Sequence, residues 1–121
     1  MAVEIKRCQL FNETLAFHLQ NTPGIARSYA EFIRTKEADP MQKYGPSDYP
    51  MTGPFKGHRH AHLSQDVSIV YTISGANPHI LKLYMVGSHV ELGTSRTPNP
   101  KKQMQVAKQI NRQQFESRRK S

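Results

Sequence analysis

Three histidines at alternating positions are the residues best suited to chemistry in this sequence. His58, His60 and His62 would share one face of an extended strand, roughly 6.6–6.8 Å apart, because residues two apart on a strand point the same way. Asp66 and His89 follow and can join them if the strands turn back on one another. Three interpretations are open: a solvated polar face, a metal site, since an H-x-H pair with a third ligand suits Zn²⁺, or acid–base catalysis.

The acid–base interpretation corresponds to a specific reaction, the cleavage of RNA without a metal ion. A base removes the proton of the ribose 2′-OH, an acid protonates the leaving 5′-oxygen, and cations stabilise the charge of the phosphorane. Histidine suits the first two roles because its ordinary pKa is about 6.5, and lysine or arginine suits the third.

The positive charge of the chain is concentrated at its C-terminal end. The 121 residues include 17 Lys and Arg and 9 Asp and Glu, for a formal net charge of +8. Positions 1–93 have a net charge of +1, whereas positions 94–121 have a net charge of +7. A positive field confined to one segment favours a polyanion such as nucleic acid, and the alternative is a solvated tail that only aids solubility.

Other features exclude several classes of protein. Cys8 is the only cysteine, so there is no intrachain disulfide framework and no zinc site built from several cysteines. No apolar run approaches the ~18–20 residues that span a bilayer. The first residues, MAVEIKRC, have charges where a signal peptide has its apolar stretch, so we expect a cytoplasmic protein with no membrane partner.

The periodicity of apolar residues predicts a strand and two helices in the first third of the chain. Residues 3–7 alternate as a strand, and residues 10–20 carry a helical pattern. Thr22 can cap a second helix that has Pro23 at its first position and runs to about Thr35. We interpret the two helices as a hairpin, followed by a loop at 36–54 that is rich in Pro and Gly.

Three further strands, a meander, are predicted at 55–63, 68–73 and 80–86, because their connections are short. A last helix is predicted at 101 to about 118, with so few apolar positions that it packs weakly or only on a partner. The fold class is therefore α+β. The N-terminal strand and the hairpin pack on an antiparallel sheet of about four strands, and a basic helix follows. The predicted domain is 1–93, with 94–121 as a basic extension.

The predicted meander also carries a resemblance to a known family. Asp48-Tyr49-Pro50-Met51, Gly53 and Phe55-Lys56-Gly57-His58-Arg59, with His62, resemble the D-H-P-L…G-x-W-K-G-Y-R-x-x-H signature of YafQ-type toxins. These toxins are ribosome-dependent mRNA interferases of the RelE superfamily. The similarity continues through Asp66, Ile69-Val70-Tyr71 and Val86-Gly87-Ser88-His89, so it covers positions 48–93.

The resemblance implies roles for individual residues. His62, Asp66 and His89 match catalytic positions, with His89 as the general acid, and Tyr49 stands where the family has a catalytic histidine. The substrate-binding candidates are Lys56, Arg59, His58 and His60. Arg59 would lie on the same face of the predicted strand as the apolar residues Ala61 and Leu63, so the alternative for it is a buried structural arginine. Asp66 could equally shape a turn, and His89 could end a strand.

Three departures from the family pattern bear on activity. Tyr49 replaces a histidine, and with an ordinary pKa of about 10 it is a poor base at neutral pH. Val67 and Gly93 replace aromatic residues of the family, which removes surface on which a base could stack. These changes favour the alternative of a catalytically weakened RelE-fold module that binds RNA, the ribosome or a protein.

The first expectation is an endoribonuclease that cleaves mRNA, as the toxin of a toxin–antitoxin-like pair. The resemblance implies no metal and no organic cofactor. It implies mRNA, the ribosome and an antitoxin protein as partners. A gyrase-poisoning relative on the same fold would have no need for this histidine set.

Overall fold

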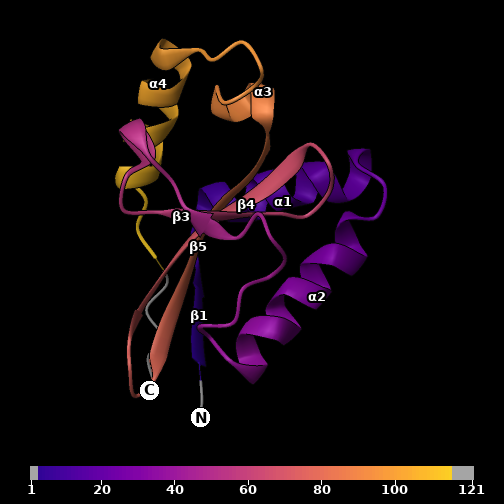
Figure 1. Cartoon of the computed structure of the whole chain (residues 1–121), viewed down its shortest axis with the longest axis vertical. Helices are drawn as coiled ribbons and strands as arrows, with labels where there is room; N and C mark the ends of the chain where they lie inside the picture. Colours follow the sequence, from indigo (N-terminus) through magenta and orange to yellow (C-terminus); the bar gives the residue numbers. More distant parts are fainter. Residues whose placement is uncertain (1–2, 116–121) are drawn as a thin grey trace.

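The computed structural model describes residues 3–115 as one sheet covered by helices (Figure 1). Helices α1 and α2 lie along one side of the sheet, and the short helix α3 and helix α4 gather at one end of the molecule (Figure 1). The elements in chain order are β1 (Val3–Arg7), α1 (Gln9–Asn21), α2 (Ile25–Ala38), β2 (Tyr49–Pro50), the 3-10 turn η1 (Gly53–Phe55), β3 (Arg59–His62), β4 (Val67–Gly75), β5 (His79–Ser88), α3 (His89–Leu92) and α4 (Pro100–Asn111).

The sheet has five strands in the order β1-β5-β4-β3-β2. Strands β3, β4 and β5 form the predicted antiparallel meander. The N-terminal strand differs from the expectation of a wholly antiparallel sheet, because β1 pairs with β5 in parallel, with Val3 opposite His79. Parallel neighbours need a long crossover connection, and the helical hairpin and the strands that follow it supply one.

The two N-terminal helices form because their apolar residues recur on one face. Phe11 of α1 and Phe32 of α2 are completely buried, and the ring of Phe32 lies 5.2 Å from that of Tyr71 on β4. The boundary between the helices differs from the prediction. Thr22 ends α1, and α2 begins only at Ile25, after Gly24 takes a left-handed conformation with φ of 84°.

The strand predicted at 55–63 is shorter in the structure. Phe55 belongs to η1 and is buried, and regular pairing begins only at Arg59. Gly57 has a φ of +100°, which a strand residue does not adopt, and it therefore breaks the alternation that the sequence suggested. His58 consequently precedes the strand rather than lying in it.

The prediction that the last helix packs weakly is wrong. Val106, Ala107 and Ile110 of α4 are buried in the main hydrophobic core. The side chain of Gln113, just after α4, accepts a hydrogen bond from the backbone N–H of Leu10 at 3.3 Å and so satisfies a free donor at the start of α1. The helix ends at Asn111 rather than near residue 118, and positions 116–121 lie outside the described residues.

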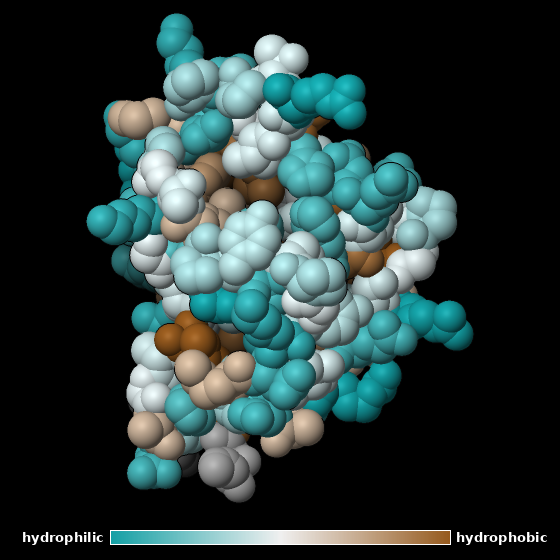
Figure 2. All heavy atoms as spheres, viewed as in Figure 1, coloured by the Kyte–Doolittle hydropathy of each residue, from teal (hydrophilic) through white to brown (hydrophobic). Residues whose placement is uncertain are grey.

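The face seen in Figure 2 is mostly hydrophilic, with apolar side chains in small separate areas. In the described part of the chain, no helix combines the length and the apolar character needed to cross a membrane.

Candidate functional site

Two of the three alternating histidines meet His89 at one end of the sheet. His60 and His62 lie on the same face of β3, because they are two residues apart on a strand. Their partners on β4 are Val70 and Ser68. With Tyr49 of β2 and His89 of α3 they line a pocket of about 200 Å³. The remaining wall is formed by Met51, Ser68, Leu92 and Thr94.

The rings in this pocket form a continuous row. The ring centroids of Tyr49 and His60 are 4.6 Å apart, those of His60 and His62 are 5.9 Å apart, and those of His62 and His89 are 5.2 Å apart. The edge-to-face arrangement of His62 and His89, with an interplanar angle of 84°, brings together two imidazoles capable of acid–base chemistry, one from β3 and one from α3.

Asp66 fixes the orientation of His89. Its Oδ1 lies 2.8 Å from His89 Nδ1, and its backbone oxygen accepts the backbone N–H of His89 at 3.1 Å. With the Asp66 carboxylate as acceptor, Nδ1 carries the proton of the neutral ring, so Nε2 is the nitrogen left for a substrate. This is the arrangement that orients a catalytic imidazole in many enzymes.

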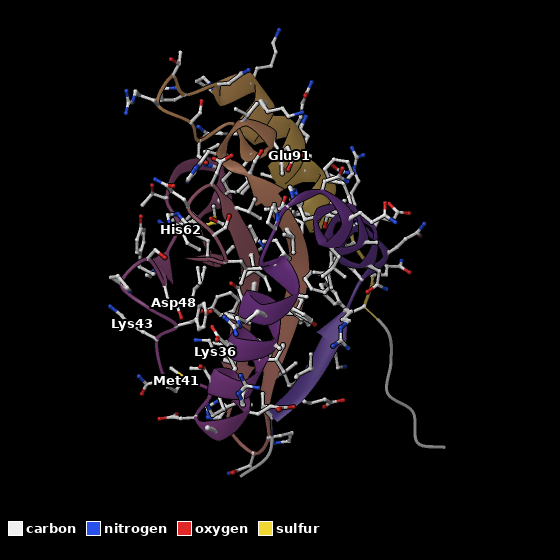
Figure 3. All side chains as sticks on the ribbon, turned by 90° about the vertical axis from the view of Figure 1, so that its right-hand side faces the viewer. Lys36, Met41, Lys43, Asp48, His62 and Glu91 are labelled. Atoms are coloured by element: carbon white, nitrogen blue, oxygen red, sulfur yellow. The ribbon has the colours of Figure 1, made fainter. Side chains whose placement is uncertain are left out.

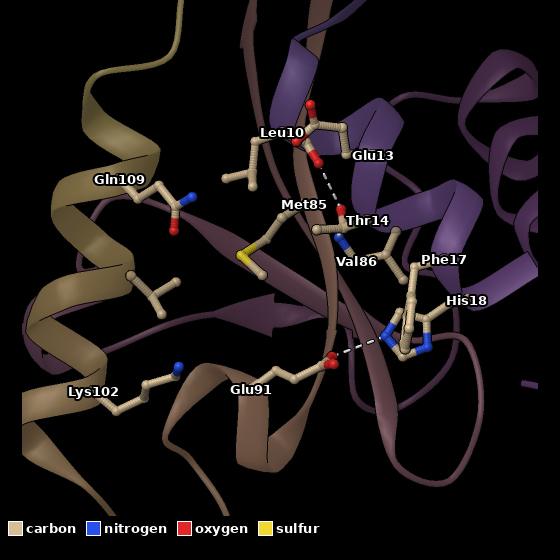
Figure 4. Close-up of a pocket in the computed structure, with 11 residues that line it drawn as sticks. Leu10, Glu13, Thr14, Phe17, His18, Met85, Val86, Glu91, Lys102 and Gln109 are labelled. Atoms are coloured by element: carbon tan, nitrogen blue, oxygen red, sulfur yellow. Dashed lines mark hydrogen bonds and ion pairs between the residues drawn. The ribbon is translucent and has the colours of Figure 1, made fainter. Parts of the chain in front are cut away.

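Helix α3 is held in place from its other side. Ser88 and Glu91 form a capping box, in which Ser88 Oγ accepts the Glu91 N–H at 3.1 Å and Glu91 Oε1 accepts the Ser88 N–H at 2.8 Å. Glu91 Oε1 also lies 2.8 Å from Nε2 of His18, a buried residue of α1 (Figure 4). The first residue of α3 is His89, so these contacts set the position of its backbone.

The cavity shown in Figure 4 is larger than the histidine pocket, at about 320 Å³, and lies between α1, β5, α3 and α4. Its acid–base pair, His18 and Glu91, is already committed to holding α3. The smaller pocket is therefore the better candidate for catalysis, because it brings His62 and His89 together.

The environment of the pocket favours the neutral form of two of its histidines. Burial lowers the pKa of His62, and the neighbouring His89 lowers it further. Burial and the nearby His62 and His89 lower the pKa of His60 in the same way. Both imidazoles are therefore neutral near pH 7, which is the form a general base requires.

The other predicted substrate-binding residues lie elsewhere. His58 is turned toward Tyr84, with ring centroids 4.7 Å apart, and Lys56 is exposed in the turn after η1. Arg59 lies on the face of β3 opposite to His60, where its guanidinium donates to Tyr71 Oη at 3.1 Å and to the backbone oxygen of Asp48 at 3.1 Å. These contacts favour the structural alternative for Arg59.

Asp48 explains why the segment before Tyr49 is held so firmly. This carboxylate is fully buried and accepts hydrogen bonds from Lys36 Nζ at 2.8 Å, from the hydroxyl of Tyr71 and from Arg59 Nη2 at 3.3 Å. Burial alone would raise the pKa of Asp48, but the bonds from Lys36 and Tyr71 outweigh it and lower the pKa. Asp48 is thus an ionised anchor directly before Tyr49.

Several residues of the site escaped sequence reasoning. Ser47 Oγ accepts the backbone N–H of His62 at 3.0 Å, and Met51 and Thr94 line the pocket. Met51 belongs to the segment that resembles the family signature but was not singled out as a site residue, and no motif marked Ser47 or Thr94. All three residues lie in loops, outside the two-residue strand β2. Ser68 could have been found from the predicted meander, because it lies directly opposite His62 on the neighbouring strand.

The two positions at which the family has aromatic residues lie in different surroundings. Val67 is the first residue of β4 and is buried. Gly93 ends α3 with a φ of +78°, and a Cβ there would lie 2.9 Å from the backbone oxygen of Asn99 and 3.0 Å from the backbone nitrogen of Gln103. The approach of α4 thus leaves no room for an aromatic side chain at position 93.

Among residues 3–115, no group of three or more His, Cys, Asp or Glu side chains is placed to hold a metal ion. The geometry supports a pair of imidazoles, one oriented by a carboxylate, for proton transfer to and from a bound substrate.

No protein-family model matches the sequence, and no curated protein matches it either. Solved structures do match the fold. A chain of the E. coli DinJ–YafQ toxin–antitoxin complex superposes with a TM-score of 0.63 at 16% identity, covering 76% of this chain and 98% of that chain. A metal-bound toxin from Helicobacter pylori gives a TM-score of 0.60 at 26% identity, covering 74% of this chain and 97% of that one.

A YoeB/ParE toxin from Agrobacterium tumefaciens is similar as well, with a TM-score of 0.59 at 17% identity. It covers 74% of this chain and 99% of its own length. These proteins are matched over almost their whole length, and about a quarter of this chain lies outside each match. The chain has the RelE-superfamily toxin fold, and the YafQ-like resemblance of its sequence is confirmed at the level of that fold.

Proposed function

We propose that this protein is an endoribonuclease toxin that cleaves mRNA on the ribosome by acid–base catalysis without a metal ion. The observation that carries the proposal is the contact between His62 and His89, with Asp66 on Nδ1 of His89. A neutral imidazole and a carboxylate-oriented imidazole, 5.2 Å apart between ring centroids, are what the two proton transfers of RNA cleavage need.

Each group then has a distinct role. His62, neutral because burial and His89 lower its pKa, takes the proton of the ribose 2′-OH. The 2′-oxygen attacks the phosphorus as the bond between phosphorus and the 5′-oxygen breaks. The imidazolium form of His89, which keeps its Nδ1–H on Asp66, gives its Nε2 proton to that 5′-oxygen. The products are a 2′,3′-cyclic phosphate and a 5′-hydroxyl end. Tyr49 and His60 form the wall along which the substrate lies.

The partners follow from the same proposal. A toxin fold implies an antitoxin, and one of the matched structures is a toxin–antitoxin complex. The mRNA and the ribosome are proposed as substrate and site of action because the resemblance is to the YafQ type. We propose the cytoplasm as the location, where these partners meet.

The test is cleavage of mRNA in a translating extract. We expect His62→Ala and His89→Ala to lower the rate by about 10²–10⁴, the usual loss for a general acid or base. His79→Ala is the matched control, because His79 opens β5 and does not line the pocket. Full activity of the His62→Ala, His89→Ala double variant would contradict the proposal.

EDTA separates this mechanism from the metal-site interpretation of the histidines. We expect the cleavage rate to be unchanged by EDTA under conditions in which the ribosomes are kept intact with Mg²⁺. Loss of cleavage that Zn²⁺ restores would instead favour a site built on His60 and His62.

The second candidate is a catalytically weakened module that binds RNA, the ribosome or a protein. One observation favours it: none of the described lysines and arginines lines the histidine pocket. A phosphorane would then receive an N–H from neutral His60 in place of a cation, which stabilises negative charge less. Retained ribosome binding together with no cleavage by the unaltered protein would select this candidate.

A further inference from the structure

A further cavity lies on the other side of β3. It has a volume of about 230 Å³ and is lined by Lys36, Lys43, Arg59 and Tyr71, with Met41 at its rim among the apolar residues. A water molecule in the liquid takes up about 30 Å³, so this volume holds one phosphate group and a few waters. Figure 3 shows Lys43 and Met41 on the same side of the molecule as Asp48, below His62.

The charges around this cavity do not balance. Lys36 Nζ lies 2.8 Å from one oxygen of Asp48, and Arg59 Nη2 lies 3.3 Å from the other, so two cations share one carboxylate. Tyr71 adds no negative charge, because burial and its bond to Asp48 raise its pKa. The cluster carries one net positive charge, and Lys43 on the wall brings the cavity to two.

Hydrogen-bond donors are also left over. Lys36 Nζ has three protons and donates to Asp48 and, at 2.7 Å, to the backbone oxygen of Gln42. Arg59 bonds through Nε and Nη2, and its Nη1 has no partner within residues 3–115. An excess of charge and of donors beside an open cavity is favourable for an anion, because the positive field is already in place before the anion arrives.

No further carboxylate among the described residues neutralises the excess positive charge of this cavity. Asp48 is the only carboxylate in contact with the cluster among the described residues, and it is used by Lys36, Arg59 and Tyr71 together. Asp39, at the end of α2, turns its Oδ1 to the backbone N–H of Met41 at 3.1 Å and does not line the cavity.

We propose that this cavity is a phosphate-binding site, separate from the histidine pocket on the opposite face of β3. The ligand chemistry is a phosphate group, held by Lys43 and by the free Nη1 of Arg59, while the buried ammonium of Lys36, which also lies over the rings of Phe32 and Tyr71, adds positive charge to the wall. The group can belong to a free phosphate compound or to the backbone of a bound RNA. Only the second source rests on the proposed function.

Inorganic phosphate is the probe for the site itself. We expect a saturable shift of the backbone amide signals of Met41 and Lys43 in ¹H–¹⁵N NMR spectra as phosphate is added at constant ionic strength. Lys43→Gln should weaken binding about tenfold, since a hydrogen bond to a charged group contributes about that factor. Lys43 is exposed and has no side-chain hydrogen bond within residues 3–115, so this variant should fold normally.

Two further variants make the phosphate test specific. Lys43→Arg should bind phosphate nearly as well as the unaltered chain, because it keeps the charge. Arg27→Gln removes an exposed cation from α2 that does not line the cavity, and it should leave phosphate binding unchanged. Absence of a saturable shift, or equal weakening by Arg27→Gln and Lys43→Gln, would overturn the proposal.

A single-stranded RNA oligonucleotide without terminal phosphates distinguishes the two sources. If the oligonucleotide displaces phosphate from the unaltered chain, the site binds the RNA backbone. If phosphate stays bound in the presence of saturating RNA, the ligand is a free phosphate compound. His62→Ala should bind phosphate normally in either case, so failure of the cleavage mechanism does not imitate failure of this site.

Discussion

At the scale of single residues, the pair of His62 and His89 determines how the pocket responds to pH. Burial is the main reason that the pKa of His62 is lowered, and the positive charge that His89 can carry is the second. The base is thus kept free of protons near neutral pH first by its burial and second by the same residue that is proposed to act as the acid.

A substitution at His89 tests this coupling directly. His89→Gln removes a positive charge beside His62, and the pKa of His62 should therefore rise toward its ordinary value of about 6.5. An NMR titration that follows the His62 Cε1–H signal measures the shift. A pKa of His62 that stays the same, or falls, in His89→Gln contradicts a charge interaction between the two rings.

At Tyr49, substitutions can test the role of the ring separately from the role of the hydroxyl. Its ring lies edge-on to His60, with centroids 4.6 Å apart, and its side chain is exposed. We expect Tyr49→Phe to lower the cleavage rate while RNA affinity stays constant, because the ring contact survives and the hydroxyl does not. Tyr49→Ala should lower affinity as well. Single-turnover cleavage and a separate binding assay measure the two effects, and unchanged cleavage by Tyr49→Phe would show that the residue only packs.

At the scale of elements, α4 belongs to the core of the molecule. Ile110 is 1% exposed, so Ile110→Ala should lower the free energy of unfolding by about 2–5 kcal/mol through lost burial and a new cavity. Met104→Ala is the control on the same helix, because Met104 is 52% exposed and should change stability by less than about 0.5 kcal/mol. Urea unfolding measures both, and equal small effects would mean that α4 is only loosely attached.

The histidines at and before β3 should make stability depend on pH. Burial lowers the pKa of His58, His60 and His62, so the unfolded chain binds more protons than the folded one in that range. Their contribution is fully present above the unfolded pKa of about 6.5 and is lost as the pH falls through the lowered folded values. His58→Gln should flatten this loss in urea unfolding between pH 5 and 8.

The control for that experiment is Met104→Leu, which carries no titrating group and should keep the slope of the unaltered chain. A His58→Gln chain that loses stability with falling pH as steeply as the unaltered chain would contradict the role of His58.

Some of the helices and strands were predictable from the sequence and others were not. Alternation and short turns predicted the meander and therefore the meeting of His60, His62 and His89. The sequence could not reveal that Gly57 would take a positive φ and turn His58 toward Tyr84. The sequence also suggested a weakly packed last helix, because that helix has few apolar positions. In the structure, three buried residues, Val106, Ala107 and Ile110, are enough to hold α4, because η1 and α3 lie beside it.

At the scale of the whole molecule, the exposed cations of positions 94–115 form the basic part of the chain that the structure describes. These are Arg96, Lys101, Lys102, Lys108 and Arg112. They do not line the histidine pocket, so a role in anchoring the protein on RNA fits them better than a role in cleavage. Because α4 is part of the core, cutting the chain after Gly93 would disturb the fold as well as the charge.

Point substitutions test that anchoring role without unfolding the helix. The double variant Lys101→Gln, Lys108→Gln should weaken RNA binding and reduce the slope of log K against log salt by about 1.4, at roughly 0.7 for each phosphate contact with a single strand. Arg27→Gln, Arg34→Gln on α2 is the control with the same loss of charge. Equal salt slopes for the two double variants would mean that α4 has no special part in binding RNA.

The general fold was predictable because an α+β arrangement follows from the order of the elements, and the family resemblance lay within the meander. The parallel pairing of β1 was not predictable from alternation, because Val3 and Ile5 show the same pattern whichever direction the neighbouring strand takes. The cavity beside Asp48 was hidden for a similar reason, since Lys36 and Arg59 meet only at the buried Asp48 and Lys43 reaches the same cavity from the loop after α2.

The position of β1 beside β5 has a consequence for the timing of synthesis. The first strand has no neighbour until residues 79–83 have left the ribosome, and the first turn of α1 waits for Gln113 to satisfy the N–H of Leu10. Chains grow at about 5–20 residues per second, so the nascent protein passes seconds without its complete sheet. The complete five-stranded sheet therefore forms only late in synthesis, after the segment that carries β5 has emerged.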